Sequence, residues 1–567
     1  MYDERFSYCL DGAFYCQDRI TPNQAENLDI LFKLLRAHPI DKALTNIRGG
    51  AFSLVVCDHE RRTITLIADR YGLRPIFYRI TKNGDKVLLD FGFHLDQWRD
   101  SSVDSIAVAE FALYGCLLFS DSFHADVKRL PGGKYLVVSD SGGEVIRDWW
   151  QYSRPECADK RPLEFHIENV DSAFGVFFQR IPENLQVIAG LSGGYDSRLI
   201  VAYLRKFGVN SIQTLTMGRA HSEEAIYAEK IAQTLNVPHT LKSVPSDLIA
   251  KHGDEIASCF QLNASLENAH VLFLRDFVAE TLEYLGNAVY LDGFLGDVVM
   301  GGTYFAEAAR TPSGMWKDLV DGFQITSLCK LEDYVDIAIR SKQRIRDARL
   351  EAVVANESFW EILRERVRKQ IASIHASALS HEDMLNRMRL AQRGYRYIVT
   401  GPNTLSSLLP VYLPFMDYAV RDALDAIPMS LLARHVFYRA FMRAKFPAIA
   451  AVPKAYNGAS ASSSEFAFRL RQYLSGFMRH VVYSSLFVWS GGKIDLRPEY
   501  ACIERYFRDA NNLRWIAETF AHFGLSPALE LYQFEPTSQL RILTLLLSGE
   551  RSGIKIDDFI GNLANVS

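Results

Sequence analysis

The fold is decided by residues 185–207, which read LQVIAGLSGGYDSRLIVAYLRKF. The first seven residues are mostly apolar and have the length of a buried strand, whereas apolar residues recur at helical spacing after residue 197. A turn with two glycines lies between them. Glycine lets the backbone turn sharply and approach a ligand, and the helix that follows directs free N–H groups at an anion. We therefore predict a strand–loop–helix unit with a pyrophosphate site in its loop.

Each residue type in this loop suits that chemistry. Ser192 and Ser197 add hydroxyl donors, Gly193 and Gly194 allow close approach of the backbone, and Asp196 can hold the Mg²⁺ that accompanies a polyphosphate. A turn followed by a helix cap explains the same residues without a ligand, but the strand–loop–helix context favours the phosphate site. The loop is not a Walker A loop, since the chain contains no G-x-x-x-x-G-K-[ST].

The same alternation continues after this unit. Residues 211–218 (SIQTLTMG) have the pattern of a second strand, and residues 223–235 (EEAIYAEKIAQTL) have that of a second helix. This order predicts a parallel sheet with helices on its faces. After residue 303 we expect a mainly helical portion that caps the sheet and is interrupted by prolines. These prolines are Pro402, Pro410, Pro414 and Pro428.

The N-terminal part has a different pattern. From residue 47 to about residue 138, short apolar runs such as AFSLVV and KYLVVS alternate with turn sequences such as DHERR and KNGDK. This pattern is typical of a small sheet-based domain. The polar residues 149–162, with two prolines, suit a linker. We predict an α/β chain with two domains, residues 1–155 and residues 165–567.

Length and composition narrow the function classes. At 567 residues the chain is too long for one ordinary core, and its eight cysteines form no CxxC pair or zinc-spaced cluster. The 63 basic and 67 acidic residues are intermixed and give a formal net charge of −4, which predicts no nucleic-acid partner. We find no signal-peptide pattern and no apolar run of membrane-spanning length. We therefore expect a soluble, cytoplasmic protein without a membrane partner.

Four stretches resemble one family. Residues 192–197 resemble the SGGxDS motif of PP-loop enzymes, which split ATP between the α and β phosphates. Residues 292–302 (DGFLGDVVMGG) resemble the second acidic loop of the same enzymes. Residues 413–428 (LPFMDYAVRDALDAIP) and 449–462 (IAAVPKAYNGASAS) resemble later segments of the asparagine synthetase domain. The chain is thus similar to the asparagine synthetase family, whose relatives include β-lactam synthetases and lasso-peptide cyclases.

The resemblance implies a site. Asp196 and Asp297 would flank one Mg²⁺, which fits the rule that α/β sheets bind ligands at the carboxyl ends of their strands. Lys454 would stabilise charge on the reacting phosphate, and backbone at the strand ends would bind adenine. The implied nucleotide-binding residues are Leu191, Ser192, Gly193, Gly194, Asp196, Ser197, Met217 and Gly293. Taken alone, residues 292–297 are equally consistent with a turn, and Lys454 with a solvated surface charge.

The N-terminal part resembles the class II glutaminase domain of the same enzymes. The similar stretches are residues 44–80 and 129–138, and they imply an Ntn-like α+β sandwich. Class II glutaminases use an N-terminal cysteine as nucleophile and base, whereas residue 2 is Tyr2 here and the nearest cysteine is Cys9. We therefore interpret this domain as a vestigial, structural glutaminase fold.

The second acidic loop departs from the family at Phe294. Asparagine synthetases usually carry Glu at this position and β-lactam synthetases carry Tyr, and that residue orients or deprotonates the incoming amine. Phenylalanine can do neither. We expect Phe294 to form an apolar wall of the acceptor pocket, which suits a substrate larger than aspartate.

These observations together predict an ATP-dependent, AMP-forming carboxylate–amine ligase, similar to glutamine-hydrolysing asparagine synthase, with ATP and Mg²⁺ as cofactors. The partners would be a small-molecule, peptide or glycan carboxylate and ammonia or an amine, and a homodimer is compatible with the resemblance. One alternative is an intramolecular cyclase, which needs no ammonia. An alternative from another class is a nucleotide-binding pseudoenzyme.

Overall fold

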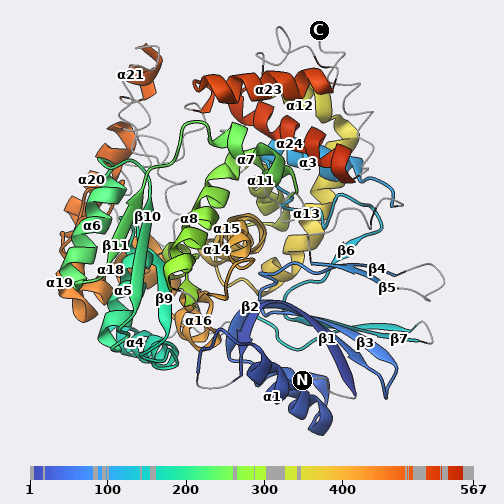
Figure 1. Cartoon of the computed structure of the whole chain (residues 1–567), viewed down its shortest axis with the longest axis horizontal. Coiled ribbons are helices and arrows are strands. Elements are labelled where there is room, and N and C mark those ends of the chain that lie inside the picture. The colour runs from blue at the N-terminus through green and yellow to red at the C-terminus, as the bar shows by residue number, and fades with distance from the viewer. Residues whose placement is uncertain are drawn as a thin grey trace.

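The computed structural model shows an antiparallel N-terminal part, a parallel sheet with helices and a helical portion (Figure 1). It describes residues 5–552 except residues 17–18, 81–86, 92–97, 99–100, 141–142, 153–160, 259–264, 286–287, 302–325, 341–346, 479–481, 483, 490–505, 524 and 526–533. Tyr2, most of the predicted linker and the start of the predicted helical portion lie outside the described residues.

A five-stranded parallel sheet forms the centre of the C-terminal part. Its strand order is β11-β10-β9-β12-β13, and every neighbouring pair is parallel. Strand β9 is fully buried at residues 187–189, because a continuous apolar run suits a strand that is covered on both faces. The strands are β9 (Gln186–Gly190), β10 (Ile212–Met217), β11 (His239–Lys242), β12 (Ala288–Leu291) and β13 (Val411–Tyr412).

Helices pack around this sheet and connect its strands (Figure 1). They are α4 (Leu163–Gln179), α5 (Tyr195–Lys206), α6 (Glu223–Leu235), α7 (Leu248–Ser258), α8 (Ala269–Leu285) and α9 (Gly296–Gly301). Helix α6 shows how local sequence sets the ends: the Ser222 hydroxyl accepts the N–H of Ala225 at 3.2 Å, and Asn236 ends the helix in the left-handed region at φ 50°.

The N-terminal part contains two antiparallel sheets. One has the order β1-β2-β3-β7-β8 and the other has the order β5-β4-β6. The strands are β1 (Phe6–Tyr15), β2 (Gly49–Asp58), β3 (Thr63–Ala68), β4 (Phe77–Ile80), β5 (Val87–Asp90), β6 (Lys128–Arg129), β7 (Lys134–Ser139) and β8 (Glu144–Asp148). The helices are α1 (Ala25–Ala37), α2 (Ile40–Leu44) and α3 (Ser105–Tyr114).

A helical portion follows the parallel sheet in the sequence and also contributes its last strand, β13. Its longer helices are α11 (Leu331–Arg340), α12 (Ala348–Val354), α13 (Glu357–Ser377), α14 (His381–Arg389), α15 (Thr400–Leu405), α16 (Tyr418–Asp425), α18 (Val436–Lys445), α20 (Glu465–Phe477), α21 (Ser484–Trp489), α23 (Ala510–His522) and α24 (Pro536–Ser552). The remaining pieces are the π-helical η7 (Leu390–Ile398), η8 (Pro414–Met416), α17 (Met429–Leu432), η9 (Ala433–His435) and α19 (Pro447–Ala450). The short η3 (Leu266–Asn268) directly precedes α8.

The five-stranded N-terminal sheet and the parallel sheet share one hydrophobic core. The same buried cluster contains Phe14 and Phe52 from the first part and Val187 and Tyr412 from the second. The ring of Tyr15, at the end of β1, lies 6.0 Å from the ring of Tyr412, centroid to centroid. The apolar interiors of the two parts are therefore continuous with each other.

The predicted fold class is confirmed, because the N-terminal sheets are antiparallel and the later sheet is parallel with helices between its strands. The strand predicted from residues 51–56 lies within β2, the strand predicted at residues 211–218 contains β10, and the predicted helix at residues 223–235 coincides with α6. The domain boundaries stay predictions. Among the described residues, no helix combines the length and apolar character that crossing a membrane requires.

One predicted interruption is wrong. Pro402 lies inside α15, as its third residue, and its carbonyl accepts the N–H of Ser406 at 3.1 Å. A proline is tolerated in the first turn of a helix, where its missing N–H costs little. Pro410 precedes β13, Pro414 begins η8 and Pro428 precedes α17, as expected for interruptions.

Candidate active site

The predicted site residues lie on loops at the carboxyl ends of two neighbouring strands. Leu191 directly follows β9, and Asp292 directly follows β12, which pairs with β9 in parallel. Loops that leave adjacent parallel strands meet at the same edge of a sheet. The sheet topology therefore brings together two motifs that are about a hundred residues apart in the sequence.

Two serines of the glycine loop form hydrogen bonds within it. The hydroxyl of Ser197 accepts the N–H of Ser192 at 2.9 Å, and the hydroxyl of Ser192 accepts the N–H of Gly194 at 3.1 Å. Gly194 precedes α5 and no side chain caps this end of the helix. The first N–H groups of α5 are thus available to an anion, as the loop motif predicts.

Asp196 and Asp297 lie side by side. The backbone N–H of Asp297 donates to one oxygen of Asp196 at 2.8 Å, and the hydroxyl of Tyr438 donates to the other at 2.8 Å. Burial raises the pKa of Asp196 to about 7, and the charge of Asp297 adds to that shift. A Cβ on Gly296 would lie 2.6 Å from the Asp196 carboxyl carbon, so glycine is required for this close approach.

Lys454, on the loop between α19 and α20, contacts the same pair of carboxylates through Asp297. Its ammonium donates to Asp297 Oδ1 at 2.9 Å, and His435 Nε2 lies 2.5 Å from that oxygen. Although burial acts in the opposite direction, Lys454 and His435 hold the pKa of Asp297 well below its usual range. The ammonium also lies 5.0 Å from the centre of the Tyr195 ring. With 18% of its side chain exposed, Lys454 is not a solvated surface lysine.

The loop that carries Lys454 is anchored to the glycine loop. The N–H of Ala455 donates to the carbonyl of Gly193 at 2.9 Å, and the N–H of Tyr456 donates to the Glu223 carboxylate at 2.9 Å. A Cβ on Gly193 would lie 2.5 Å from Cβ of Ala455, so a larger residue there would push the two loops apart. The loop that carries Lys454 is therefore docked on the glycine loop in this structure.

Arg198 strengthens this connection. It is fully buried, and its guanidinium donates to the carbonyls of Gly193 at 2.8 Å and Gly194 at 2.8 Å, within the glycine loop. It also donates to three carbonyls in the segment before Lys454, those of Ile449 at 3.1 Å, Val452 at 2.8 Å and Pro453 at 2.9 Å. Arg198 forms no ion pair with a described carboxylate, so its hydrogen bonds all serve the two loops.

Three side chains of this site escape sequence reasoning, namely Arg198, His435 and Tyr438. Arg198 follows the loop motif as an ordinary helix residue, and the other two lie before and within α18 without a recognisable spacing to Lys454. A structural signal is present instead: His435 has φ 61° and Leu295 has φ 60°. Non-glycine residues in the left-handed region often mark functional sites.

The other residues predicted to contact the nucleotide or the acceptor lie in different surroundings. Leu191 N–H donates to the carbonyl of Leu215 at 2.8 Å, so this group already serves the sheet. Met217 ends β10, and Gly293 lies against Asp196, where a Cβ would approach the Asp196 Cβ to 3.0 Å. Phe294 is only 4% exposed and belongs to the main core cluster. The nucleotide contacts and the apolar acceptor wall stay predictions.

The carboxylates fit a magnesium ion that is shared with phosphate. The described residues contain no ready cluster of three or more His, Cys, Asp or Glu side chains. Mg²⁺ in nucleotide sites is commonly held by one or two carboxylates, with phosphate oxygens and waters completing its coordination. Asp196 and Asp297, which lie side by side next to the glycine loop, would be two such carboxylates if Mg²⁺ bound there.

Cys9, the cysteine nearest to residue 2, lies on a strand of the N-terminal part. Cys9 lies inside β1, opposite Val55 of β2, and its residue is exposed. Burial of part of the thiol and the charge of Asp11 raise the pKa of Cys9. A reactive thiol needs a lowered pKa, so the surroundings of Cys9 do not activate it.

Comparison with known proteins agrees with this architecture. The asparagine synthase family profile matches residues 179–457, and the glutamine amidotransferase domain profile matches residues 28–150. The chain thus combines a synthetase-type α/β part with a glutamine amidotransferase-type part. The two profiles and the curated relatives support the asparagine synthetase family for this chain.

Individual relatives are distant. The asparagine synthetase [glutamine-hydrolyzing] of Mesocricetus auratus is 25% identical over 248 residues, covering 41% of this chain and 42% of that protein. The enzyme of the same name from Homo sapiens is 26% identical over 201 residues, covering 34% of each chain. The chain thus matches about two fifths of the length of its curated relatives. The NH3-dependent NAD synthetase of Campylobacter jejuni shows 16% identity with a TM-score of 0.21 and covers 38% of this chain and 97% of its own.

Proposed function

We propose that the protein is an ATP-dependent, AMP-forming ligase that joins a carboxylate to ammonia or an amine. The observation that carries this proposal is the convergence of Asp196, Asp297 and Lys454 beside a glycine loop whose helix N-terminus is uncapped. The meeting of a partly buried lysine with two partly buried carboxylates at a strand-end loop is the kind of arrangement that often marks a functional site.

In the proposed first step an oxygen of the substrate carboxylate attacks the α-phosphorus of ATP, and the bond to the β-phosphate oxygen breaks. The products are an acyl-adenylate and pyrophosphate. The N–H groups of the glycine loop and the ammonium of Lys454 would stabilise negative charge on the phosphates. Mg²⁺ held by Asp196 and Asp297 would neutralise further phosphate charge. When the nucleotide binds, the ammonium of Lys454 would leave Asp297 and donate to a phosphate oxygen instead.

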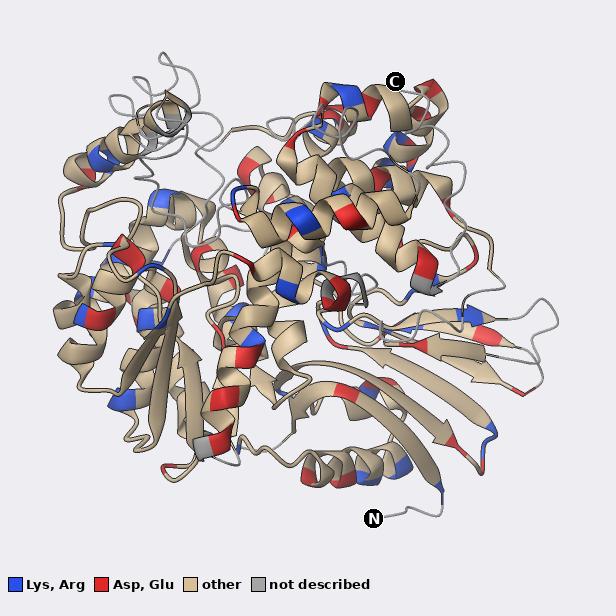
Figure 2. Ribbon diagram, turned by 45° about the horizontal axis from the view of Figure 1, so that its top comes forward, with Lys and Arg blue, Asp and Glu red and all other residues tan. Residues whose placement is uncertain are grey.

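In the second step the nitrogen of ammonia or an amine attacks the acyl carbonyl, AMP leaves with the bonding electrons of the C–O bond, and the nitrogen releases one proton to solvent to give the amide. The environment of Cys9 supports a structural role for the N-terminal part, so the nitrogen would come from free ammonia, from a substrate amine or from another chain. Charged residues of both signs are interspersed over the molecule (Figure 2), which supports a small or mixed-charge substrate rather than a polyanion.

Exchange of labelled pyrophosphate into ATP tests the first step. Purified protein is incubated with Mg²⁺, ATP and a panel of amino acids, sugar acids and short peptides. We expect exchange with at least one carboxylate, and a loss of about a hundredfold or more in Lys454→Ala, because one preorganised cation at the developing charge is removed. The matched control is Lys251→Ala, an exposed lysine of α7.

Two outcomes would contradict the proposal. Formation of ADP and phosphate, with no AMP, would exclude cleavage between the α and β phosphates. Exchange that is as fast in Lys454→Ala as in the control would remove this lysine from the reacting phosphates.

A further inference from the structure

A pocket lies outside the candidate active site. It is formed where β4 and β6 face the loop of residues 117–127 and the segment from η7 to α15. Its empty space is about 560 Å³, part of it open to solvent. None of the carboxylates or loops of the candidate active site lines it. Its apolar walls include Phe77, Trp98 and Phe123.

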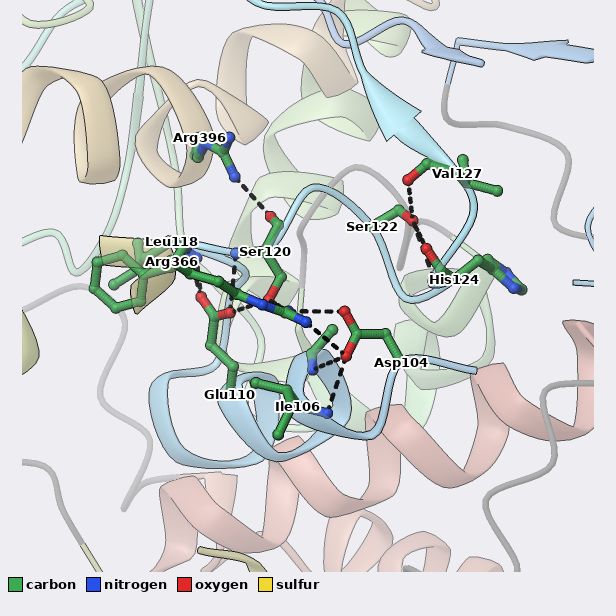
Figure 3. A network of polar contacts seen from close by, with 12 residues as sticks. Asp104, Ile106, Glu110, Leu118, Ser120, Ser122, His124, Val127, Arg366 and Arg396 are labelled. Carbon is green, nitrogen blue, oxygen red and sulfur yellow. Dashed lines mark hydrogen bonds and ion pairs between the residues drawn. The ribbon is translucent and has the colours of Figure 1, made fainter. Parts of the chain in front are cut away.

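One wall of this pocket is rigidly built. The carboxylate of Glu110, on α3, accepts the N–H groups of Leu118 at 2.5 Å, Phe119 at 2.7 Å and Ser120 at 3.0 Å (Figure 3). Glu110 is fully buried, and burial raises its pKa. A buried acid that receives these N–H groups fixes the backbone of the loop, so the pocket wall is preformed.

Two arginines line the pocket and differ in their partners. Arg396 donates to the carbonyl of Ser120 at 2.6 Å and contacts the carboxylate of Asp121 at 3.3 Å. One amino group of Arg129 donates to two carbonyls, those of Gly72 at 2.7 Å and Tyr395 at 3.3 Å. No described carboxylate forms an ion pair with Arg129, and its other N–H groups donate to no described residue.

The charge of Arg129 is therefore poorly compensated. Burial and the neighbouring Arg396 lower the pKa of Arg129 to about 9, although Asp121 and Asp69 oppose the shift from a distance. Removing a cation from water without a paired anion is costly. An anion in the pocket would supply the missing partner, and the open N–H groups of the guanidinium could bind its oxygens.

His124 adds a second unsatisfied group to the same pocket. Its residue is 4% exposed, and apart from a weak contact with the backbone of Ser101 neither ring nitrogen makes a hydrogen bond with a described residue. Its ring points away from the turn that Ser122 closes with Val127 (Figure 3). Burial lowers the pKa of His124 to about 4, so the ring is neutral at pH 7 and can donate one hydrogen bond. Buried polar groups without partners are uncommon in folded proteins.

We propose that this pocket binds a small organic carboxylate, whose oxygens contact Arg129 and His124 while its apolar body lies against Phe77, Trp98 and Phe123. The apolar walls favour an organic ligand over an inorganic anion. The guanidinium, which has no ion-pair partner among the described residues, favours a carboxylate over a neutral apolar compound. The site is independent of the proposed ligase activity, and its test uses no turnover.

Calorimetric titration of the whole protein with benzoate, benzamide and inorganic phosphate tests the site. We expect benzoate to bind, benzamide to bind at least tenfold more weakly and phosphate to bind at least tenfold more weakly. Arg129→Gln should weaken benzoate binding by tenfold or more and leave benzamide unchanged. Arg147→Gln, an exposed arginine of β8, is the matched control and should bind benzoate like the wild type.

Thermal unfolding in the presence of benzoate gives an independent measurement, because a ligand of the folded state raises the unfolding temperature. If Arg129→Gln does not fold, Arg129→Lys is tested in its place. Lysine keeps the positive charge but lacks the planar guanidinium, so we expect Arg129→Lys to weaken benzoate binding. Equal binding of benzoate and benzamide, equal binding of benzoate and phosphate, or benzoate binding that is unchanged in the Arg129 variant would each overturn the proposal.

Discussion

Arg198 shows how one residue links the two halves of the candidate site. Its carbonyl partners lie in the glycine loop and in the segment before Lys454, and no described carboxylate competes for them. We treat it as a positioning residue, because it contacts the loops and not the reacting groups. Its removal should displace the lysine relative to the phosphate site, and a displacement of about 1 Å is enough to slow a reaction on the order of a hundredfold.

We therefore expect Arg198→Met to lower the rate of pyrophosphate exchange by at least tenfold while the apparent KM for ATP changes much less. Arg198→Lys should recover part of the rate, since lysine can still donate to some of these carbonyls. Arg205→Met, an exposed arginine of the same helix, is the control. If KM and rate changed in equal proportion in Arg198→Met, the residue would serve nucleotide binding in general and not the position of Lys454.

At the scale of the element, the sequence is informative where periodicity and caps are strong. Helix α6 follows directly from its apolar spacing, with Ser222 and Asn236 at its ends. Strand β1 is not evident in the sequence, because Asp11 and Gly12 interrupt its apolar residues and only pairing with β2 defines it. The same limit applies to the site: motifs identify Asp196 and Asp297, whereas His435 and Tyr438 reach them only through tertiary packing.

Helix α6 also carries a group that should make stability depend on pH. Burial raises the pKa of Glu224 from 4.5 to about 7, although a hydrogen bond from Tyr456 opposes the shift. The folded state thus holds a proton that the unfolded state releases between these values. Stability from this group is present below about pH 4.5 and is lost as the pH rises through about 7.

We expect Glu224→Gln to remove this loss, so the variant should gain stability relative to the wild type as the pH rises from 4.5 to 8. The gain should be on the order of 2 kcal/mol. Urea unfolding at several pH values measures it, and Glu229→Gln, an exposed residue of the same helix, is the control. An identical pH profile for wild type and Glu224→Gln would show that Glu224 is ionised in the folded protein at neutral pH.

At the scale of the whole molecule, Arg74 joins the N-terminal sheets to the helical portion. It is 2% exposed and donates to the carboxylate of Asp11 on β1 at 2.7 Å. The same guanidinium donates to the carbonyl of Asn403 at 3.0 Å and to the hydroxyl of Ser406 at 2.6 Å. With the shared apolar core, this contact predicts that the two parts unfold together, although the sequence divides them clearly.

Arg74→Met should therefore destabilise the entire protein and not the N-terminal part alone. The substitution leaves Asp11 as a largely buried charge without its partner, which typically costs about 3 kcal/mol or more. Urea unfolding followed by both tryptophan fluorescence and far-UV circular dichroism should show one transition, shifted to lower urea in the variant. Because the unpaired carboxylate causes much of the loss, Asp11→Asn combined with Arg74→Met should be more stable than Arg74→Met alone. Two separate transitions, of which only one moved in Arg74→Met, would show that the parts are stable independently and that the shared core does not couple them.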